Sequence, residues 1–288
     1  MTLTDFTPYL SAGIDGLPKV KLQAPGGARA EIYLHGGHVT SWVPAGGDER
    51  LFLSRTSEFG PKSAIRGGVP VIFPQFSGRG PLLKHGFARR MDWELAACGV
   101  DPKNPSRTFA TLQLKDSPAT RTIWPHNFQF NLTVAVAGNE LSLQVEITNS
   151  GAEAISFTTA LHTYLRVADI QFTSIHGLGG RSYLDSAPRE IEKRQPNADL
   201  TFIGEVDRIY FPAPEIVAVQ DGENQVRVMA ENFTDCVIWN PGAKKGAALG
   251  DLEANGYRKF VCVESGAILK AVSLEPGESW SADQRLTG

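Results

Sequence analysis

FQFNLTVAVAGNELSLQVEI, residues 128–147, is the stretch that decides the fold class. Apolar side chains alternate with polar ones from 128 to 136, and the alternation resumes from 141 to 147 beyond Gly138-Asn139. A period of two places the apolar side chains on one face of a strand, and a Gly-Asn pair favours a tight turn. The stretch therefore predicts an antiparallel hairpin with one face in the core and the other in water.

Short apolar runs recur along the rest of the chain, while helical periodicity is scarce. Many short strands between turn residues predict an all-β sandwich or barrel, mostly antiparallel, and one domain over residues 1–288 is the simplest organisation. Only 57–60 and 249–254 favour a helical turn. Further strands are expected at 30–34, 39–43, 69–73, 93–98, 108–114, 155–161, 216–220, 225–230, 237–240, 260–263 and 271–274.

The composition argues against several classes of partner. The net charge is −3 and the isoelectric point is about 6.1, so we expect neither nucleic acid nor an acidic membrane surface as a partner. No apolar run approaches a membrane span, and residues 1–20 lack the pattern of a secretory leader. The three cysteines form no C-x-x-C pair and leave one over, which indicates a reducing compartment. A cytoplasmic monomer acting on a small molecule is expected.

A second stretch, AIRGGVPVIFPQFSGRGPLLKHGFARRMDW at 64–93, carries unusual chemistry. Arg66 precedes Gly67-Gly68, which allow positive φ or a close backbone approach. Arg89 follows on the far side of a Gly/Pro loop. Guanidinium groups present planar forks of donors to anions, so we expect Arg66 and Arg89 to hold an anionic, polar ligand.

The loop at 77–83 is long enough to fold over a pocket and to deliver His85 and Arg89 to its far side. Arg79 and Arg90 lie nearby and could bind the anion instead. No phosphate-binding glycine motif occurs, so nucleotide binding has no support.

His35 and His38 were considered as metal ligands. In an extended segment, positions three apart face opposite sides, and no third ligand follows at a suitable spacing. Polar turn or pocket-rim residues are the better interpretation.

Three polar residues stand in or against apolar runs: His162, Asp207 and Glu264. His162 could be a hydrogen-bonded core residue, and Asp207 a turn residue. Glu264 ends an apolar run, where a carboxylate needs a partner such as an arginine, or a catalytic purpose. Together, a carboxylate base and an imidazolium acid can act on opposite sides of a polar substrate. A second catalytic carboxylate of the kind that most glycosidases use is not evident, with Asp207 the one candidate.

An ordered set of motifs between about Tyr33 and about Trp280 resembles the glucose-6-phosphate 1-epimerases, the hexose-6-phosphate mutarotases of the aldose 1-epimerase superfamily. Each motif alone is weak, and the ordered set is specific. The motifs are 64–70 (AIRGGVP), 73–76 (FPQF), 85–89 (HGFAR), 161–164 (LHTY), 207–210 (DRIY), 237–241 (VIWNP) and 263–266 (VESG).

The resemblance implies a galactose-mutarotase-like β-sandwich, also called a supersandwich, that acts without a metal or an organic cofactor. It implies that Glu264 is the general base at the anomeric hydroxyl and that His162 is the general acid at the ring oxygen. Opening of the ring, rotation about C1–C2 and reclosure would exchange the α and β anomers.

The resemblance also implies a set of substrate-binding residues. Arg66 and Arg89 would hold the 6-phosphate, Asp207 would bind sugar hydroxyls, and His85 would lie near the ring. Gln75, within the FPQF motif, is placed in the same set.

Lys84 departs from the family pattern, in which a neutral residue often precedes the His-Gly motif. It could add a third cation for phosphate or point to solvent. We include it in the substrate-binding set.

Two other functions remain open at this point. A carbohydrate or sugar-phosphate binding protein without turnover would use a pocket with Trp42 and Trp239. An aldose 1-epimerase for unphosphorylated sugars would keep the acid and base but would have less use for paired arginines.

Overall fold

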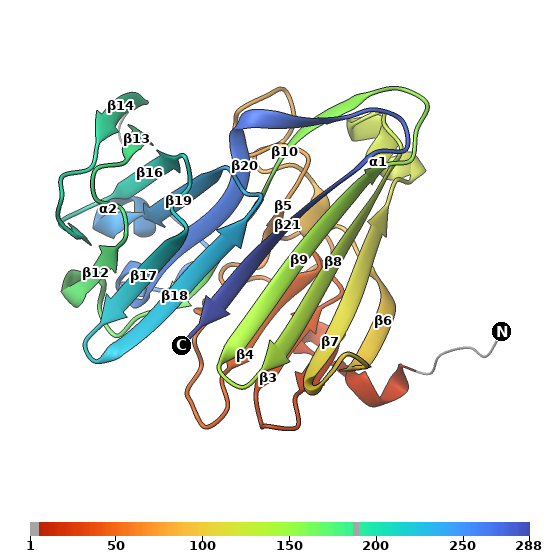
Figure 1. Ribbon diagram of the computed structural model, residues 1–288, viewed down its shortest axis with the longest axis horizontal. Coiled ribbons are helices and arrows are strands. Elements are labelled where there is room, and N and C mark those ends of the chain that lie inside the picture. Colours follow the sequence, from red (N-terminus) through yellow and green to blue (C-terminus); the bar gives the residue numbers. More distant parts are fainter. Residues whose placement is uncertain (1–5, 187–189) are drawn as a thin grey trace.

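Three antiparallel sheets form the fold in the computed structural model, which describes residues 6–186 and 190–288 (Figure 1). The predicted all-β class is confirmed. Residues 1–5 of the segment searched for a leader lie outside the described part. Within the described ranges, no helix is long and apolar enough to cross a membrane.

A nine-stranded sheet contains the stretch that decided the fold class. Its strands, in spatial order, are β15 (Leu200–Thr201), β12 (Thr173–His176), β17 (Ile216–Asp221), β18 (Asn224–Glu231), β21 (Ser279–Thr287), β9 (Glu140–Asn149), β8 (Phe128–Ala137), β7 (Asn104–Lys115) and β6 (Glu94–Asp101). The predicted hairpin is confirmed, because β8 and β9 pair without a register shift across the turn at Gly138-Asn139.

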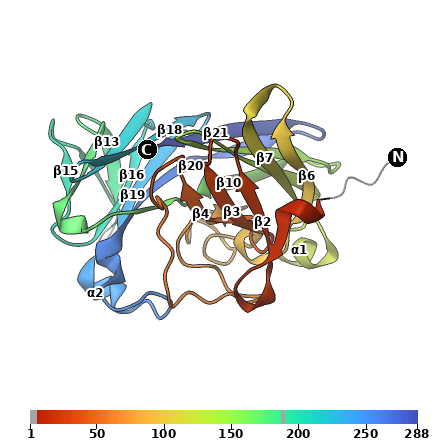
Figure 2. The same ribbon diagram turned by 90° about the horizontal axis from the view of Figure 1, so that it is seen from below.

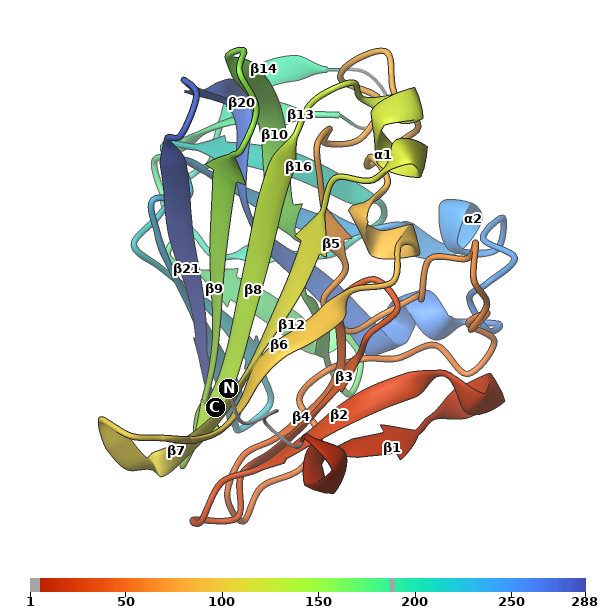
Figure 3. The same ribbon diagram turned by 90° about the vertical axis from the view of Figure 1, so that its right-hand side faces the viewer.

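An eight-stranded sheet forms the second layer. Its order is β14 (Ile191–Arg194), β13 (Ser182–Asp185), β16 (Val206–Phe211), β19 (Asp235–Asn240), β20 (Phe260–Leu274), β10 (Ile155–Leu161) and β5 (Val71–Ile72), and β11 (Tyr164–Arg166) also pairs with β20. Figure 3 shows the nine-stranded sheet on one side of the molecule and the segments that carry α1 and α2 on the other.

A smaller four-stranded sheet and short helices complete the fold. Seen from below in Figure 2, this sheet lies in front of β10 and β20. Its strands are β1 (Leu10–Ala12), β2 (Pro18–Gln23), β3 (Arg29–Tyr33) and β4 (His38–Val43). The helices are α1 (Pro118–Ile123) and α2 (Gly242–Gly246), with 3-10 turns at Thr7–Tyr9, Ile14–Gly16, Ala88–Arg90, Ile170–Phe172 and Gly256–Lys259.

One apolar core joins the sheets. The ring of Phe73, which follows β5, lies 5.1 Å from that of Phe128 and 5.3 Å from those of Phe130 and Phe157. These neighbours belong to β8 and β10, so aromatic contacts connect the inner faces of both large sheets. Aromatic pairs at such distances stabilise beyond the area that they bury.

Several predicted boundaries are wrong. The strand at 69–73 shrinks to Val71–Ile72, because Pro70 and Pro74 offer no N–H to a ladder. The strands at 260–263 and 271–274 are one strand, β20, whose polar middle is paired and does not end it. The helical turns expected at 57–60 and 249–254 are absent from these described segments. The sequence analysis also missed the short strands β1, β2 and β11–β16, and the nine-residue β21.

Alternation along β20 prepares the functional site. Val261 and Val263 face the main core, while Phe260 and Cys262 belong to a second apolar cluster on the opposite face. Because side chains alternate, Glu264 shares the face of Phe260 and Cys262. The strand therefore carries its carboxylate away from the nine-stranded sheet.

A buried amide crosses between the two large sheets behind this strand. Gln284 of β21 is fully buried. Its Oε1 accepts from Thr163 Oγ1 at 2.6 Å, and its Nε2 donates to Ser265 Oγ at 2.8 Å. Thr163 follows His162 and Ser265 follows Glu264, so one side chain ties both segments of the predicted acid–base pair.

Candidate active site

A pocket of about 170 Å³ lies over the face of the eight-stranded sheet that carries Glu264. The strand register brings its floor together, since Glu264 lies opposite Val237 and Asp207 lies opposite Trp239. The lining residues are Arg66, Phe76, Ser77, Lys84, His85, Arg89, His162, Asp207, Val237, Trp239, Lys245, Leu249 and Glu264.

His162 and Glu264 form a direct pair, with His162 Nε2 3.3 Å from Glu264 Oε1. His162 is 7% exposed and Glu264 is 1% exposed, so both lie at the bottom of the pocket. The predicted end of a strand at Glu264 is wrong, and its partner is a histidine and not an arginine. Glu264 Oε2 and His162 Nδ1 are buried without a hydrogen-bond partner among the described residues, which leaves capacity for a ligand.

The pocket shifts both pKa values toward neutral side chains. Burial raises the pKa of Glu264 well above its ordinary range, and Asp207 raises it further against the opposing charges of Arg89 and Lys84. Burial also lowers the pKa of His162 well below its ordinary value, helped by Arg89 and Arg66. Perturbed pKa values of a carboxyl group and an imidazole in one pocket are typical of sites for general acid–base chemistry.

Aromatic rings fix the plane of His162. Its ring is stacked on Tyr164, with centroids 4.9 Å apart and planes at 11°. Trp239 meets it edge-on at 5.8 Å, and His85 at 5.6 Å. These contacts leave the imidazole little freedom to turn, so its nitrogens have defined directions.

His85 lies beside His162 and has a defined tautomer. The backbone N–H of Ser77 donates to His85 Nδ1 at 3.3 Å, so the proton of the neutral ring is assigned to Nε2. Burial, and then the charges of His162 and Arg89, lower the pKa of His85 far below its ordinary value. His85 therefore offers the pocket a neutral N–H donor.

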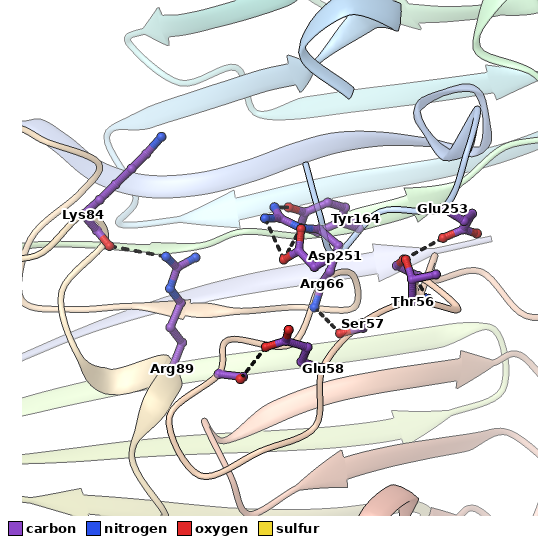
Figure 4. Close-up of polar contacts among 11 residues, drawn as sticks. Thr56, Ser57, Glu58, Arg66, Lys84, Arg89, Tyr164, Asp251 and Glu253 are labelled. Atoms are coloured by element: carbon purple, nitrogen blue, oxygen red, sulfur yellow. Dashed lines mark hydrogen bonds and ion pairs between the residues drawn. The ribbon is translucent and has the colours of Figure 1, made fainter. Parts of the chain in front are cut away.

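Arg66 is held between two partners (Figure 4). Its Nε and Nη2 contact Asp251 Oδ2 at 3.1 and 3.0 Å, and its Nη1 donates to the hydroxyl of Tyr164 at 2.9 Å. Burial opposes its charge, but Tyr164 and Asp251 together raise the pKa of Arg66. The guanidinium group is thus oriented before a ligand arrives, with N–H groups to spare.

Arg89 and Lys84 are less constrained. Arg89 Nη2 donates to the backbone oxygen of Lys84 at 3.3 Å, and the two lie together in Figure 4. Burial lowers the pKa of Arg89 to about 10. Lys84 is exposed and also lines the pocket, and burial of its amine followed by the charge of Lys245 lowers its pKa. Both cations face the pocket without a carboxylate partner among the described residues.

Asp207 lies within β16 and is not a turn residue. Its Oδ2 is 3.8 Å from Lys245 Nζ. Burial raises its pKa, while Lys245 opposes the shift. A half-buried carboxylate beside a cation can accept hydrogen bonds from sugar hydroxyls.

Other predicted residues lie elsewhere. Gln75 is buried under the loop, where its amide donates to Ser77 and Leu82 oxygens at 3.0 Å, so it positions the loop and does not line the pocket. Arg79 forms an ion pair with Glu190. Trp42, considered for a lectin-type pocket, is wholly buried in the main core.

His35 and His38 are buried structural residues and do not lie at a pocket rim. His35 contacts Asp92 at 3.0 Å and the oxygen of Ser63 at 2.8 Å. His38 contacts the oxygen of Gly67 at 2.7 Å, and burial lowers its pKa to about 3. No cluster of metal-ligating side chains occurs in the part of the chain that the structure describes.

The sequence reading missed Lys245, Asp251 and Tyr164. The first two lie in and after α2, about 180 residues beyond Arg66, so no local pattern connects them with it. Tyr164 lies within a quoted motif, but its contact with Arg66 depends on the fold.

Comparisons agree with this geometry. The family model for aldose 1-epimerase matches residues 18–287. A protein named "Putative glucose-6-phosphate 1-epimerase" from Cenchrus ciliaris is 40% identical over 272 residues, covering 92% of this chain and 83% of that protein. The crystal structure of a "putative mutarotase" from Salmonella typhimurium has a TM-score of 0.88 at 30% identity, covering 99% of this chain and 95% of that chain.

A more distant structure bears on the fold alone. A galactose mutarotase-like protein from Clostridium acetobutylicum has a TM-score of 0.74 at 15% identity and covers 96% of each chain. The expected galactose-mutarotase-like sandwich is therefore confirmed. By the family match and the similarity over nearly the whole chain, this protein belongs to the aldose 1-epimerase family and is a carbohydrate epimerase.

Proposed function

We propose that this epimerase interconverts the α and β anomers of glucose 6-phosphate and similar hexose 6-phosphates. The observation that carries the proposal is the buried pair of His162 and Glu264 at the bottom of a pocket bordered by Arg66, Lys84 and Arg89. An acid and a base serve the anomeric centre, and the cations suit a phosphate. The name of the Cenchrus ciliaris relative supports the same substrate class.

The proposed reaction starts from the charged form of the pair, carboxylate and imidazolium, which holds the same number of protons as the neutral form. One proton then leaves the substrate and one arrives. Glu264 takes the proton of the C1 hydroxyl while His162 gives its proton to the ring oxygen, so the C1–O5 bond breaks and an aldehyde forms. Rotation about C1–C2 presents the other carbonyl face. The ring then closes with the roles reversed, which restores both side chains and requires no further reactant.

Substrate must separate the pair for this chemistry. His162 and Glu264 contact each other in the structure, whereas the reaction needs them at O5 and at the C1 hydroxyl. The free Glu264 Oε2 and His162 Nδ1 show unused capacity in both groups. His85 and Asp207 are assigned to the ring hydroxyls.

The test is anomer exchange measured by NMR on glucose 6-phosphate and on glucose. We expect exchange faster than the buffer blank, weak acceleration with glucose, and loss of acceleration in Glu264→Gln. Equal rates on both sugars would favour an aldose 1-epimerase without phosphate specificity. No acceleration on either, with glucose 6-phosphate still bound, would leave a binding protein.

A further inference from the structure

A second pocket, of about 280 Å³, lies beside the first and shares Arg66 and Arg89 with it. Its lining also includes Lys62, Arg90 and Asp251. The shared arginines show that it adjoins the candidate active site and is not a remote cavity. The full lining is Glu58, Lys62, Ser63, Ala64, Ile65, Arg66, Pro70, Arg89, Arg90, Tyr164 and Asp251.

The volumes of the two pockets, taken together, indicate the size of ligand that they would hold. Small-molecule sites usually measure roughly 300–1,000 Å³. At about 170 and about 280 Å³, each pocket alone is smaller than that, whereas the two combined fall inside the range. A ligand of ordinary size would therefore extend across the arginines from one pocket into the other.

The charges of the second pocket do not cancel. Its cations are Lys62, Arg66, Arg89 and Arg90, and its carboxylates are Glu58 and Asp251, so the balance is two positive charges. Asp251 is already paired with Arg66, and Glu58 accepts from Ser63 Oγ at 2.9 Å. Both carboxylates therefore have partners already, and among the described residues neither forms an ion pair with Lys62, Arg89 or Arg90.

Arg89 and Arg90 each have a buried donor that an anion could satisfy. The Nε atom of each is buried and has no hydrogen-bond partner among the described residues. The neighbouring charge of Arg90 also lowers the pKa of Arg89, after the larger effect of burial. Adjacent cations with buried, unpartnered donors are costly unless an anion joins them.

Building on the proposed function, we propose that the sugar ring occupies the pocket of His162 and Glu264 while its phosphate occupies the second pocket, bound by Arg90 and Lys62 as well as by the shared arginines. The two excess positive charges match a phosphate dianion. Arg90 and Lys62 are then specificity-determining residues for the phosphorylated substrate. They lie apart from the acid–base pair and should act on binding and not on proton transfer.

The first experiment compares steady-state anomer exchange in Arg90→Ala, Lys62→Ala and Arg79→Ala. Loss of a charge-assisted hydrogen bond should raise KM for glucose 6-phosphate roughly 10–100-fold in Arg90→Ala with kcat nearly unchanged. The exposed Lys62 should give only about a two- to fivefold rise. Arg90→Lys should recover part of the loss, because the charge returns without the fork.

Arg79→Ala is the matched control, since this arginine pairs with Glu190 outside both pockets. KM values for Arg90→Ala and Lys62→Ala equal to that of the control would overturn the proposal while leaving glucose 6-phosphate as the substrate. Thermal unfolding of each variant shows whether it is folded.

The second experiment uses inorganic phosphate as the probe. We expect it to inhibit competitively against glucose 6-phosphate and to bind Arg90→Ala at least tenfold more weakly than the wild type in a calorimetric titration. Noncompetitive inhibition would place phosphate at a separate effector site and contradict the proposal. If glucose 6-phosphate were not turned over, the proposed function would fail, and equal phosphate binding by wild type and Arg90→Ala would separately overturn the subsite.

Discussion

The β8–β9 hairpin of the nine-stranded sheet and the site-bearing strands of the eight-stranded sheet differ in regularity. In the nine-stranded sheet, β8 and β9 pair from end to end without a shift, and their alternate side chains are buried. In the eight-stranded sheet, β5 has two residues, the register of β10 and β20 shifts between Phe157 and Thr159, and β20 carries a buried carboxylate. The regular hairpin contributes buried apolar side chains to the core, whereas the irregular eight-stranded sheet carries a buried polar site, which is expected to cost stability.

The largest expected effect is at Glu264, where one substitution should lower the activity and raise the stability. Glu264→Gln should lower the rate of anomer exchange by roughly 10²–10⁴-fold, because the amide cannot act as a base. A substantially active variant would exclude Glu264 as the base.

The same variant should become more stable than the wild type as the pH rises. A raised pKa means that, above the ordinary range of a carboxylic acid, the folded state holds more protons than the unfolded state, so the wild type loses stability with rising pH. Gln has no such dependence, and at a pH of about 8 we expect a Tm roughly 2–4 °C higher than the wild type. A Tm difference that is equal at low and high pH would contradict this account.

In the nine-stranded sheet we expect the opposite result, a substitution that lowers stability and leaves activity unchanged. Leu132 of β8 is fully buried, so Leu132→Ala should lower the free energy of unfolding by roughly 2–5 kcal/mol while kcat of the folded enzyme remains close to wild type. Denaturant unfolding and anomer exchange measure the two effects. Gln129→Ala, on the wetter face of the same strand, is the control. A large loss of kcat in Leu132→Ala would mean that the nine-stranded sheet contributes to catalysis as well as to stability.

The pH profile tests the pair in the irregular sheet. The active form holds one proton between His162 and Glu264, so kcat/KM should be bell-shaped and fall about tenfold per pH unit beyond each limb. The limbs are assigned to the pair and not to either residue alone, because the two side chains are in direct contact. Ionisation of the substrate phosphate near pH ~6 is controlled for by repeating the profile with glucose. A flat profile on both sugars would count against the assignment.

The smallest effect concerns the link between the sheets. Gln284→Met removes the hydrogen bonds to Thr163 and Ser265 while keeping side-chain length, and we expect kcat to fall roughly tenfold through misplacement of the pair. KM should change less. Leu286→Met in the same strand is the control for altered packing. Equal kcat values in both variants would show that Gln284 serves stability alone.

The two large sheets also differ in how much of each could be predicted from the sequence. The alternation at 128–147 specifies its own pairing, because a strand with one wet face repeats every two residues. Glu264 gave an ambiguous signal, since a carboxylate within a strand resembles a strand end until its partner is known. The partners of the site residues lie in distant segments of the chain, as Asp251 does for Arg66. No local pattern predicts such contacts.

The family resemblance found most pocket residues but assigned Gln75 to the wrong surroundings. Gln75 follows Pro74 and precedes the loop, so its amide could serve either the pocket or the loop backbone. Three hydrogen bonds to that loop decide the matter in the structure. Lys245 could be found only once the pocket was known in three dimensions, whereas Arg90 was an alternative anion ligand in the sequence that the second pocket favours.

The cation-rich second pocket has a consequence for the speed of encounter. The chain has a net charge of −3, and a phosphate monoester carries about −1.5 to −2 at neutral pH, so whole-molecule charges repel. Repulsion of that kind would make association faster as salt is added. A concave positive site instead concentrates the field near its mouth, and added salt then slows association. The sign of the ionic-strength dependence therefore reports where the charges lie and not how many there are.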